Sequence, residues 1–188
     1  MRFCRSITAR SNAGAFLLLA AQGQVVDAQG RQAPEFASLF PQAADTPKPD
    51  RPEIALKIRG LGLTHVSTVR FTPHPGLSQA VVTTWCGVVV REGSAPAKPI
   101  VTIGVASTEA LSCDGLAEIG DVSSAAVPAR LGLVYRTRSA NAVSLTPLIV
   151  VRDSRSGEWR IDQTLSDEIS QQRGKASLKA IRGFLSKH

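Results

Sequence analysis

Short runs rich in β-branched residues recur along most of the chain, and Gly, Pro, Asn or Ser separates each run from the next. β-branched residues favour extended strands, while the separating residues favour turns. The sequence therefore predicts an α+β protein built on a mostly antiparallel sheet of six or seven strands. The predicted strands cover residues 54–59, 64–71, 80–91, 100–106, 130–138, 143–152 and 159–162.

Three of these segments carry more specific signals. Residues 80–90 are apolar at both odd and even positions, which predicts a central strand that is buried on both faces. Pro147 lacks a backbone N–H, so its strand should lie at an edge or contain a bulge. Residues 153–157 end in a glycine between two strands and predict a hairpin turn. Residues 114–128 fit either a loop or a further short strand.

The C-terminal segment, residues 164–188, is predicted to be helical and basic. Leu178, Ile181 and Leu185 recur at helical spacing, so we expect a C-terminal helix packed on one face of the sheet. The cations of its other face either bind an anionic surface or are simply solvated. These candidate surface-binding residues are Lys175, Lys179 and Arg182.

Residues 1–28 have the order of a secretory signal peptide. Three arginines and no acidic residue precede a run of nine small or apolar residues, and cleavage is predicted after Ala28. The run is too short for a transmembrane helix, which needs about 20 apolar residues. We therefore expect a periplasmic or secreted protein. Loss of three Arg and one Asp would lower its formal net charge from +7 to +5.

Residues 29–52 contain five of the 11 prolines and are expected to form a Pro-rich linker before a β-rich core domain at residues 53–163. The alternative is a terminal segment that wraps around the domain. The sequence does not decide between the two.

Two cysteines, Cys86 and Cys113, remain after removal of the leader. An even number of cysteines in an oxidising compartment predicts a disulfide bond between them. The alternative is a pair of buried thiols, because Cys86 lies in an apolar run.

No complete catalytic motif is present in the sequence. The candidate catalytic residues are His74, Asp114 and Glu118, which offer an imidazole and two carboxylates for acid–base chemistry. Three histidines and three cysteines do not show a metal-ligand spacing, and no phosphate-binding glycine loop occurs. We therefore predict no metal site and no cofactor.

A row of arginines on the predicted strands would suit a stripe that binds phosphates, but the scarcity of aromatic residues, 5% of the chain, disfavours nucleic acid as a partner. We expect a small exported, non-catalytic binding or accessory protein that contacts another envelope or extracellular protein. The alternatives are a small secreted hydrolase and an envelope-surface protein held on anionic membrane by its basic helix. The strand arginines are Arg70, Arg91, Arg130, Arg136, Arg138 and Arg152.

Overall fold

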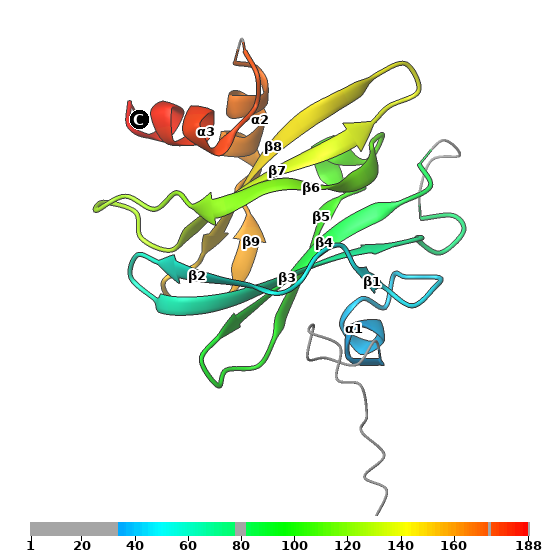
Figure 1. The fold of residues 1–188 in the computed structure, drawn as a ribbon, viewed down its shortest axis with the longest axis horizontal. Coiled ribbons are helices and arrows are strands. Elements are labelled where there is room, and N and C mark those ends of the chain that lie inside the picture. The colour runs from blue at the N-terminus through cyan, green and yellow to red at the C-terminus, as the bar shows by residue number, and fades with distance from the viewer. Residues whose placement is uncertain (1–33, 78–81, 173, 188) are drawn as a thin grey trace, which may run out of the picture.

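The computed structural model describes residues 34–77, 82–172 and 174–187, which form two antiparallel sheets and four short helices (Figure 1). The predicted leader lies outside these residues. In chain order the elements are α1 (Pro34–Leu39), β1 (Lys48–Pro49), β2 (Ile54–Ile58), β3 (Gly62–Phe71), β4 (Trp85–Glu92), β5 (Lys98–Ile103), the 3-10 helix η1 (Ala106–Thr108), β6 (Ser112–Asp121), β7 (Arg130–Arg138), β8 (Val143–Arg152), β9 (Trp159–Ile161), α2 (Gln163–Ser170) and α3 (Leu178–Leu185).

The predicted fold class, α+β with mostly antiparallel strands and a C-terminal helix on one face, is confirmed. The first sheet has the order β1-β3-β4-β5, with β2 also paired to β3, and the second has the order β6-β7-β8-β9. A strand occurs within each of the seven predicted segments, and the described residues add β1 and β6 to them. In the segment predicted over residues 80–91, β4 begins only at Trp85, and residues 80 and 81 lie outside the described residues. For residues 114–128, the strand alternative holds as far as Asp121.

The main core lies between the two sheets. Every second residue of β4 and β7 points into it, including Val88, Val90, Leu131 and Leu133, all of them fully buried. The disulfide between Cys86 and Cys113 crosses this core and joins β4 of the first sheet to β6 of the second, as predicted.

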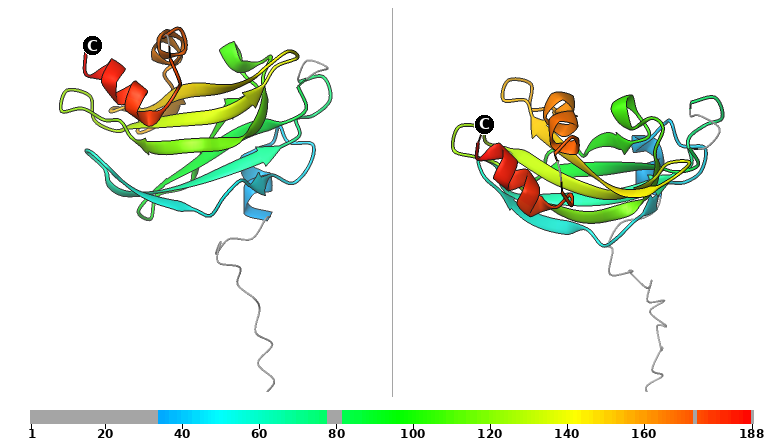
Figure 2. Two further views of the ribbon diagram at one scale, coloured as in Figure 1. Left: turned by 45° about the horizontal axis from the view of Figure 1, so that its top comes forward. Right: turned by 90° about the horizontal axis from the view of Figure 1, so that it is seen from above.

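A second apolar cluster covers the outer face of the first sheet. Phe36 of α1 and the following Phe40 pack on Val69, Phe71 and Trp85, and both phenylalanines are buried. Of the two alternatives for residues 29–52, the part from residue 34 onward therefore wraps around the sheet. This packing also explains why β4 is buried on both faces, since α1 covers the face that is turned away from the other sheet (Figure 2).

The helices α2 and α3 cover the outer face of the second sheet (Figure 2). Ile169 of α2 and Ile181 of α3 are buried there against Val134 and Ile149. The Ser177 side chain accepts a hydrogen bond from the backbone N–H of Ala180 and caps α3 at its start. The amphipathic pattern of the C-terminal segment thus serves to pack a helix on the sheet.

The hairpin prediction is confirmed, and the edge prediction for Pro147 holds only locally, because β8 lies inside its sheet but has one free side at Pro147 among the described residues. Pro147 pairs with Val134 of β7, whereas β9 pairs only with the last three residues of β8. The turn between β8 and β9 contains Gly157 at a φ of +70°, a conformation that favours glycine. No helix among the described residues is long and apolar enough to cross a membrane.

Candidate anion-binding site

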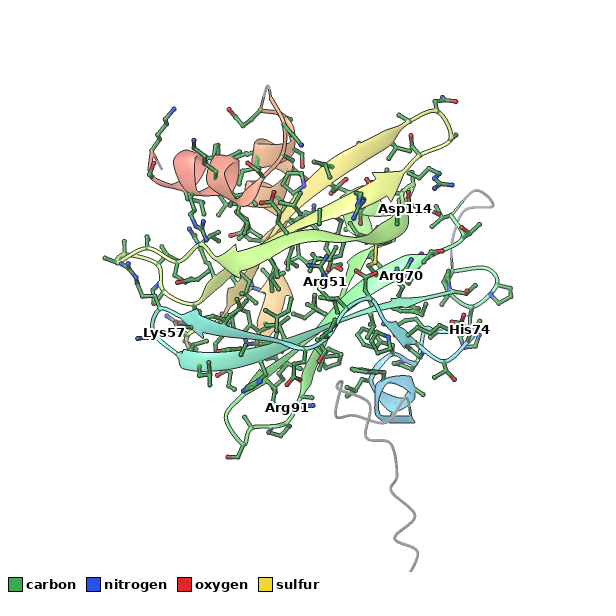
Figure 3. The ribbon with its side chains drawn as sticks, viewed as in Figure 1. Arg51, Lys57, Arg70, His74, Arg91 and Asp114 are labelled. Carbon is green, nitrogen blue, oxygen red and sulfur yellow. A yellow bond between two sulfur atoms is a disulfide. The ribbon has the colours of Figure 1, made fainter. Side chains whose placement is uncertain are left out.

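The three candidate catalytic residues are exposed, and they lie on one connection of the first sheet and on one strand of the second. His74 follows β3, and its backbone N–H donates to the Gln42 carbonyl. Asp114 and Glu118 belong to β6 of the other sheet. Figure 3 shows His74 beside the first sheet and Asp114 on β6. Among the described residues no hydrogen bond joins any two of the three.

Both candidate carboxylates support local structure. Asp114 accepts from the Arg138 guanidinium of the neighbouring strand at 3.1 Å. Glu118 accepts from the backbone N–H of Leu178, the first residue of α3, at 2.8 Å. A carboxylate at a helix N-terminus stabilises the helix, so Glu118 anchors α3 to the sheet.

The candidate surface-binding cations differ in role. Lys175 and Lys179 are exposed. Arg182 instead donates from Nε and Nη2 to the carbonyl oxygen of Asp121, at 3.2 and 3.0 Å. Its guanidinium therefore holds α3 against the end of β6.

The strand arginines do not lie on a single face. Arg70 pairs with Asp50 at 2.9 Å, Arg152 pairs with Glu92 at 2.9 Å, and Arg91 lies near Glu53 on the outer face of the first sheet. Figure 3 shows Arg70 close to the junction of the sheets and Arg91 well away from it.

Three arginines, Arg130, Arg152 and Arg160, line a pocket at one end of the sandwich, here called the arginine pocket, where the β2–β3, β6–β7 and β8–β9 connections meet. Arg152 is paired with Glu92, so Arg130 and Arg160 are the two that concern a ligand. The pocket has a volume of about 520 Å³. Its lining consists of Gly60, Leu61, residues 126–130, residues 151–154, Arg160 and Asp162.

Register places the two arginines in one row. Arg130 of β7 is paired with Val151 of β8, and Val151 is paired with Arg160 of β9. The neighbouring Leu131 and Trp159 face the main core, so these three side chains point to the opposite face. Strands lie roughly 4.8 Å apart, which puts the Cα atoms of the two arginines roughly 10 Å from each other with an apolar side chain between them.

The Arg130 side chain carries an unsatisfied donor. Its Nε is buried and has no hydrogen-bond partner among the described residues. Arg152 differs, because Glu92 Oε1 accepts from Arg152 Nε at 2.9 Å and from Trp159 Nε1 at 2.6 Å. This buried atom is closed to solvent and so to a ligand, but no ion pair or side-chain hydrogen bond engages the Arg130 guanidinium among the described residues, and the residue lines the pocket.

The two carboxylates at the pocket are held by backbone donors. Asp153 Oδ1 accepts from the N–H groups of Arg155 and Ser156, both at 2.8 Å. These hydrogen bonds from Ser156 and Arg155, together with the nearby Arg160 guanidinium, lower the pKa of Asp153 below its usual value. Asp162 Oδ1 caps α2 by accepting from the Leu165 N–H at 3.2 Å. Neither carboxylate forms an ion pair with Arg130 among the described residues, whereas Asp153 lies close enough to Arg160 for the two charges to interact.

A second groove, of about 460 Å³, follows the free edge of β8. Asp167 Oδ1 lies in it and accepts from Ser107 Oγ and from Gln163 Nε2, each at 2.8 Å. The residues that line this groove include no histidine, so the Ser107–Asp167 pair lacks the base that would activate a serine nucleophile.

Sequence reasoning found Arg130 but missed Arg160 as its neighbour. The available signal was the alternation in β9, where the large apolar Trp159 and Ile161 flank Arg160 and assign it to the other face. Across the described ranges, no three His, Cys, Asp or Glu residues come together in a way that could hold a metal ion. Comparison of the chain with protein-family models, with curated proteins and with solved structures finds no match.

Proposed function

We propose that this chain is an exported, non-catalytic binding protein that holds an anionic group of another envelope or extracellular protein in the arginine pocket. One observation carries the proposal, namely the row formed by Arg130, Val151 and Arg160, in which neither guanidinium forms an ion pair among the described residues. A guanidinium offers donors in a planar fork that matches a carboxylate, so two of them are suited to recognise one.

The distribution of the other charges supports a binding role. Glu118 anchors a helix, Asp114 pairs with Arg138, and Asp153 and Asp162 accept backbone hydrogen bonds. Each carboxylate therefore has a structural partner, whereas Arg130 Nε at the pocket has none. An incoming acidic group would supply a counter-ion for the Arg130 guanidinium.

Export is supported by the predicted leader and by the disulfide bond. Disulfides persist in oxidising compartments such as the periplasm and are rare in the cytosol. The bond between Cys86 and Cys113 closes a separation of 27 residues and links the two sheets. Such a link suits a small domain that works outside the cytosol.

The export part is tested by the intact mass of the protein produced with its own leader in a bacterial host, with and without reduction and alkylation. We expect a chain that begins at Gln29 and has two cysteines that alkylate only after reduction. A full-length mass with three freely alkylated thiols would contradict export.

The binding part is tested with a fluorescent tetraglutamate peptide and fluorescence anisotropy at low and physiological salt. We expect saturable binding that weakens about tenfold or more in Arg130→Gln/Arg160→Gln, since hydrogen bonds to charged groups contribute about 1.5–3 kcal/mol. The control is Arg155→Gln/Lys48→Gln, which also removes two positive charges, one from the exposed turn between β8 and β9 and one from an exposed position of β1. Equal loss in the control would mean that only net charge matters.

A further inference from the structure

The arginine pocket also has an apolar side. Leu61 and Val127 line it together with Val151, the middle residue of the arginine row. Val127 is 37% exposed and is one of the few large apolar side chains that the described part of the chain leaves open to solvent. A ligand that satisfies the arginines therefore meets apolar surface at the same time.

The apolar side is fixed before any ligand arrives. Ser124 and Val127 are linked by two hydrogen bonds of 3.0 Å, one from the Ser124 N–H to the Val127 carbonyl and one from the Val127 N–H to Ser124 Oγ. The next part of the loop is tied to the β2–β3 connection, because the Ala129 N–H donates to the Arg59 carbonyl at 3.0 Å.

The two connections also pack very closely at Gly60. A Cβ atom at this position would lie 2.8 Å from Cβ of Pro128, and the φ of Gly60 is +87°. Only glycine suits such a place, so the β2–β3 connection lies directly against the loop that carries Val127. A preformed site loses less conformational entropy on binding.

Resting on the function proposed above, we propose that the pocket takes the C-terminal residue of a partner chain. The α-carboxylate would lie between Arg130 and Arg160, and an apolar terminal side chain would lie against Val127 and Val151. This assignment names the end of a protein chain, and not an acidic side chain, as the anionic group.

Geometry favours a chain end over an internal acidic residue. In a C-terminal residue the carboxylate and the apolar side chain leave the same Cα, which matches a pocket where Val151 stands directly between the two arginines. An internal Asp or Glu would bring main chain on both sides of it into the pocket. A volume of about 520 Å³ lies in the range of small-ligand sites and suits one or two residues that enter from one direction.

The test uses three fluorescent octapeptides with the same dye at the N-terminus. The first ends in Val with a free carboxylate, the second is its C-terminal amide, and the third is an amide with one internal Glu beside Val. We expect the free acid to bind about tenfold or more tightly than either amide, because only its carboxylate and side chain share one Cα.

Variants assign the contacts. Arg160→Gln, at an exposed position, should remove most of the preference for the free acid over the amide, and Arg155→Gln should leave it unchanged. Val127→Ser should reduce the preference for a terminal Val over a terminal Gly by about threefold to tenfold, as expected for loss of an apolar contact of about 1 kcal/mol. The melting temperature of each variant confirms that it is folded.

The outcomes separate this inference from the function on which it rests. Equal binding of the free acid and the internal-Glu peptide would overturn the chain-end assignment and leave the acidic-partner proposal standing. Failure of all acidic probes, tetraglutamate included, would overturn both. Competition by free hexanoate at the same concentration as the peptide would also overturn the chain-end assignment, because a simple amphiphilic carboxylate would then suffice.

Discussion

Asp50 Oδ2 accepts a hydrogen bond from the backbone N–H of Leu116 at 2.8 Å, and the neighbouring Arg51 guanidinium donates to the carbonyl oxygen of the same Leu116. Two side chains thus bind both polar backbone groups of one residue at the edge of β6. No strand is paired to this edge among the described residues. Asp50 and Arg51, which precede β2, therefore connect the first sheet to the free edge of β6 through their side chains. They bind backbone groups that a neighbouring strand would otherwise have to pair.

Asp50→Ala tests how much this joint stabilises the fold. The Asp50 side chain is only 10% exposed, and its Oδ1 also pairs with Arg70 Nε at 2.9 Å. Loss of the carboxylate leaves the Leu116 N–H without its acceptor, so we expect the free energy of unfolding to fall by about 3 kcal/mol in urea denaturation. Lys48→Ala, at an exposed position of β1, is the control and should change stability by less than about 0.5 kcal/mol.

The disulfide provides a second test of the contact between the sheets. Replacing Cys86 and Cys113 together by Ala should lower the free energy of unfolding by about 3 kcal/mol, because the unfolded chain regains the freedom of a loop of this length. Reduction of the unmodified protein should lower the free energy of unfolding by a similar amount and move the denaturation midpoint to a lower urea concentration. Coincident curves before and after reduction would contradict a stabilising role.

The strand pattern predicted most of the fold because alternating burial leaves its mark in the sequence. β6 was predicted only as one of two alternatives for residues 114–128, because it contains two register shifts, one between Cys113 and Gly115 and one between Leu116 and Glu118. Such irregularities interrupt the period of two on which strand prediction depends. The division into two sheets could not be predicted either, since alternation shows that a face is buried without showing what covers it.

The candidate site could not be predicted from the sequence because it depends on how the strands pair. Arg130 and Arg160 are 30 positions apart, and they meet only because both pair through Val151. Pairing register is set by turn lengths and by the match of whole strands, which local patterns do not specify. Conversely, Asp114 and Glu118 looked available for chemistry in the sequence, and their engagement with Arg138 and with α3 becomes visible only in three dimensions.

Ile181→Ala tests the docking of α3. Ile181 is fully buried against the outer face of the second sheet, so its truncation should lower the free energy of unfolding by about 3 kcal/mol. Lys179→Ala on the same helix removes an exposed side chain and should stay within about 0.5 kcal/mol. If both changes had the same small effect, α3 would contribute little to the fold.

Asp153→Asn tests the charge in the β8–β9 turn. Hydrogen bonds from the Ser156 and Arg155 backbone lower the pKa of Asp153 in the folded state, so its ionised form stabilises the fold. This contribution should be present above the unfolded pKa of about 3.9 and disappear as the pH falls through the folded value. The stability difference from Asp153→Asn should thus shrink between pH 7 and pH 2.5 in chemical denaturation. A difference that stays constant over this range would contradict the assignment.

Glu118 distinguishes a structural carboxylate from a catalytic one. Because Glu118 Oε2 accepts from the Leu178 N–H at 2.8 Å, Glu118→Ala should destabilise the protein by about 1 kcal/mol, whereas Glu118→Gln keeps an acceptor and should cost less. His74→Ala and Asp114→Ala serve as companions at the other two candidate positions. In assays with chromogenic esters and glycosides we expect the unmodified protein and all four variants to show the same background rate. A rate above background that His74→Ala or Glu118→Gln abolishes at an unchanged melting temperature would instead favour a hydrolase, because loss of turnover without loss of folding is the signature of a group that acts on substrate.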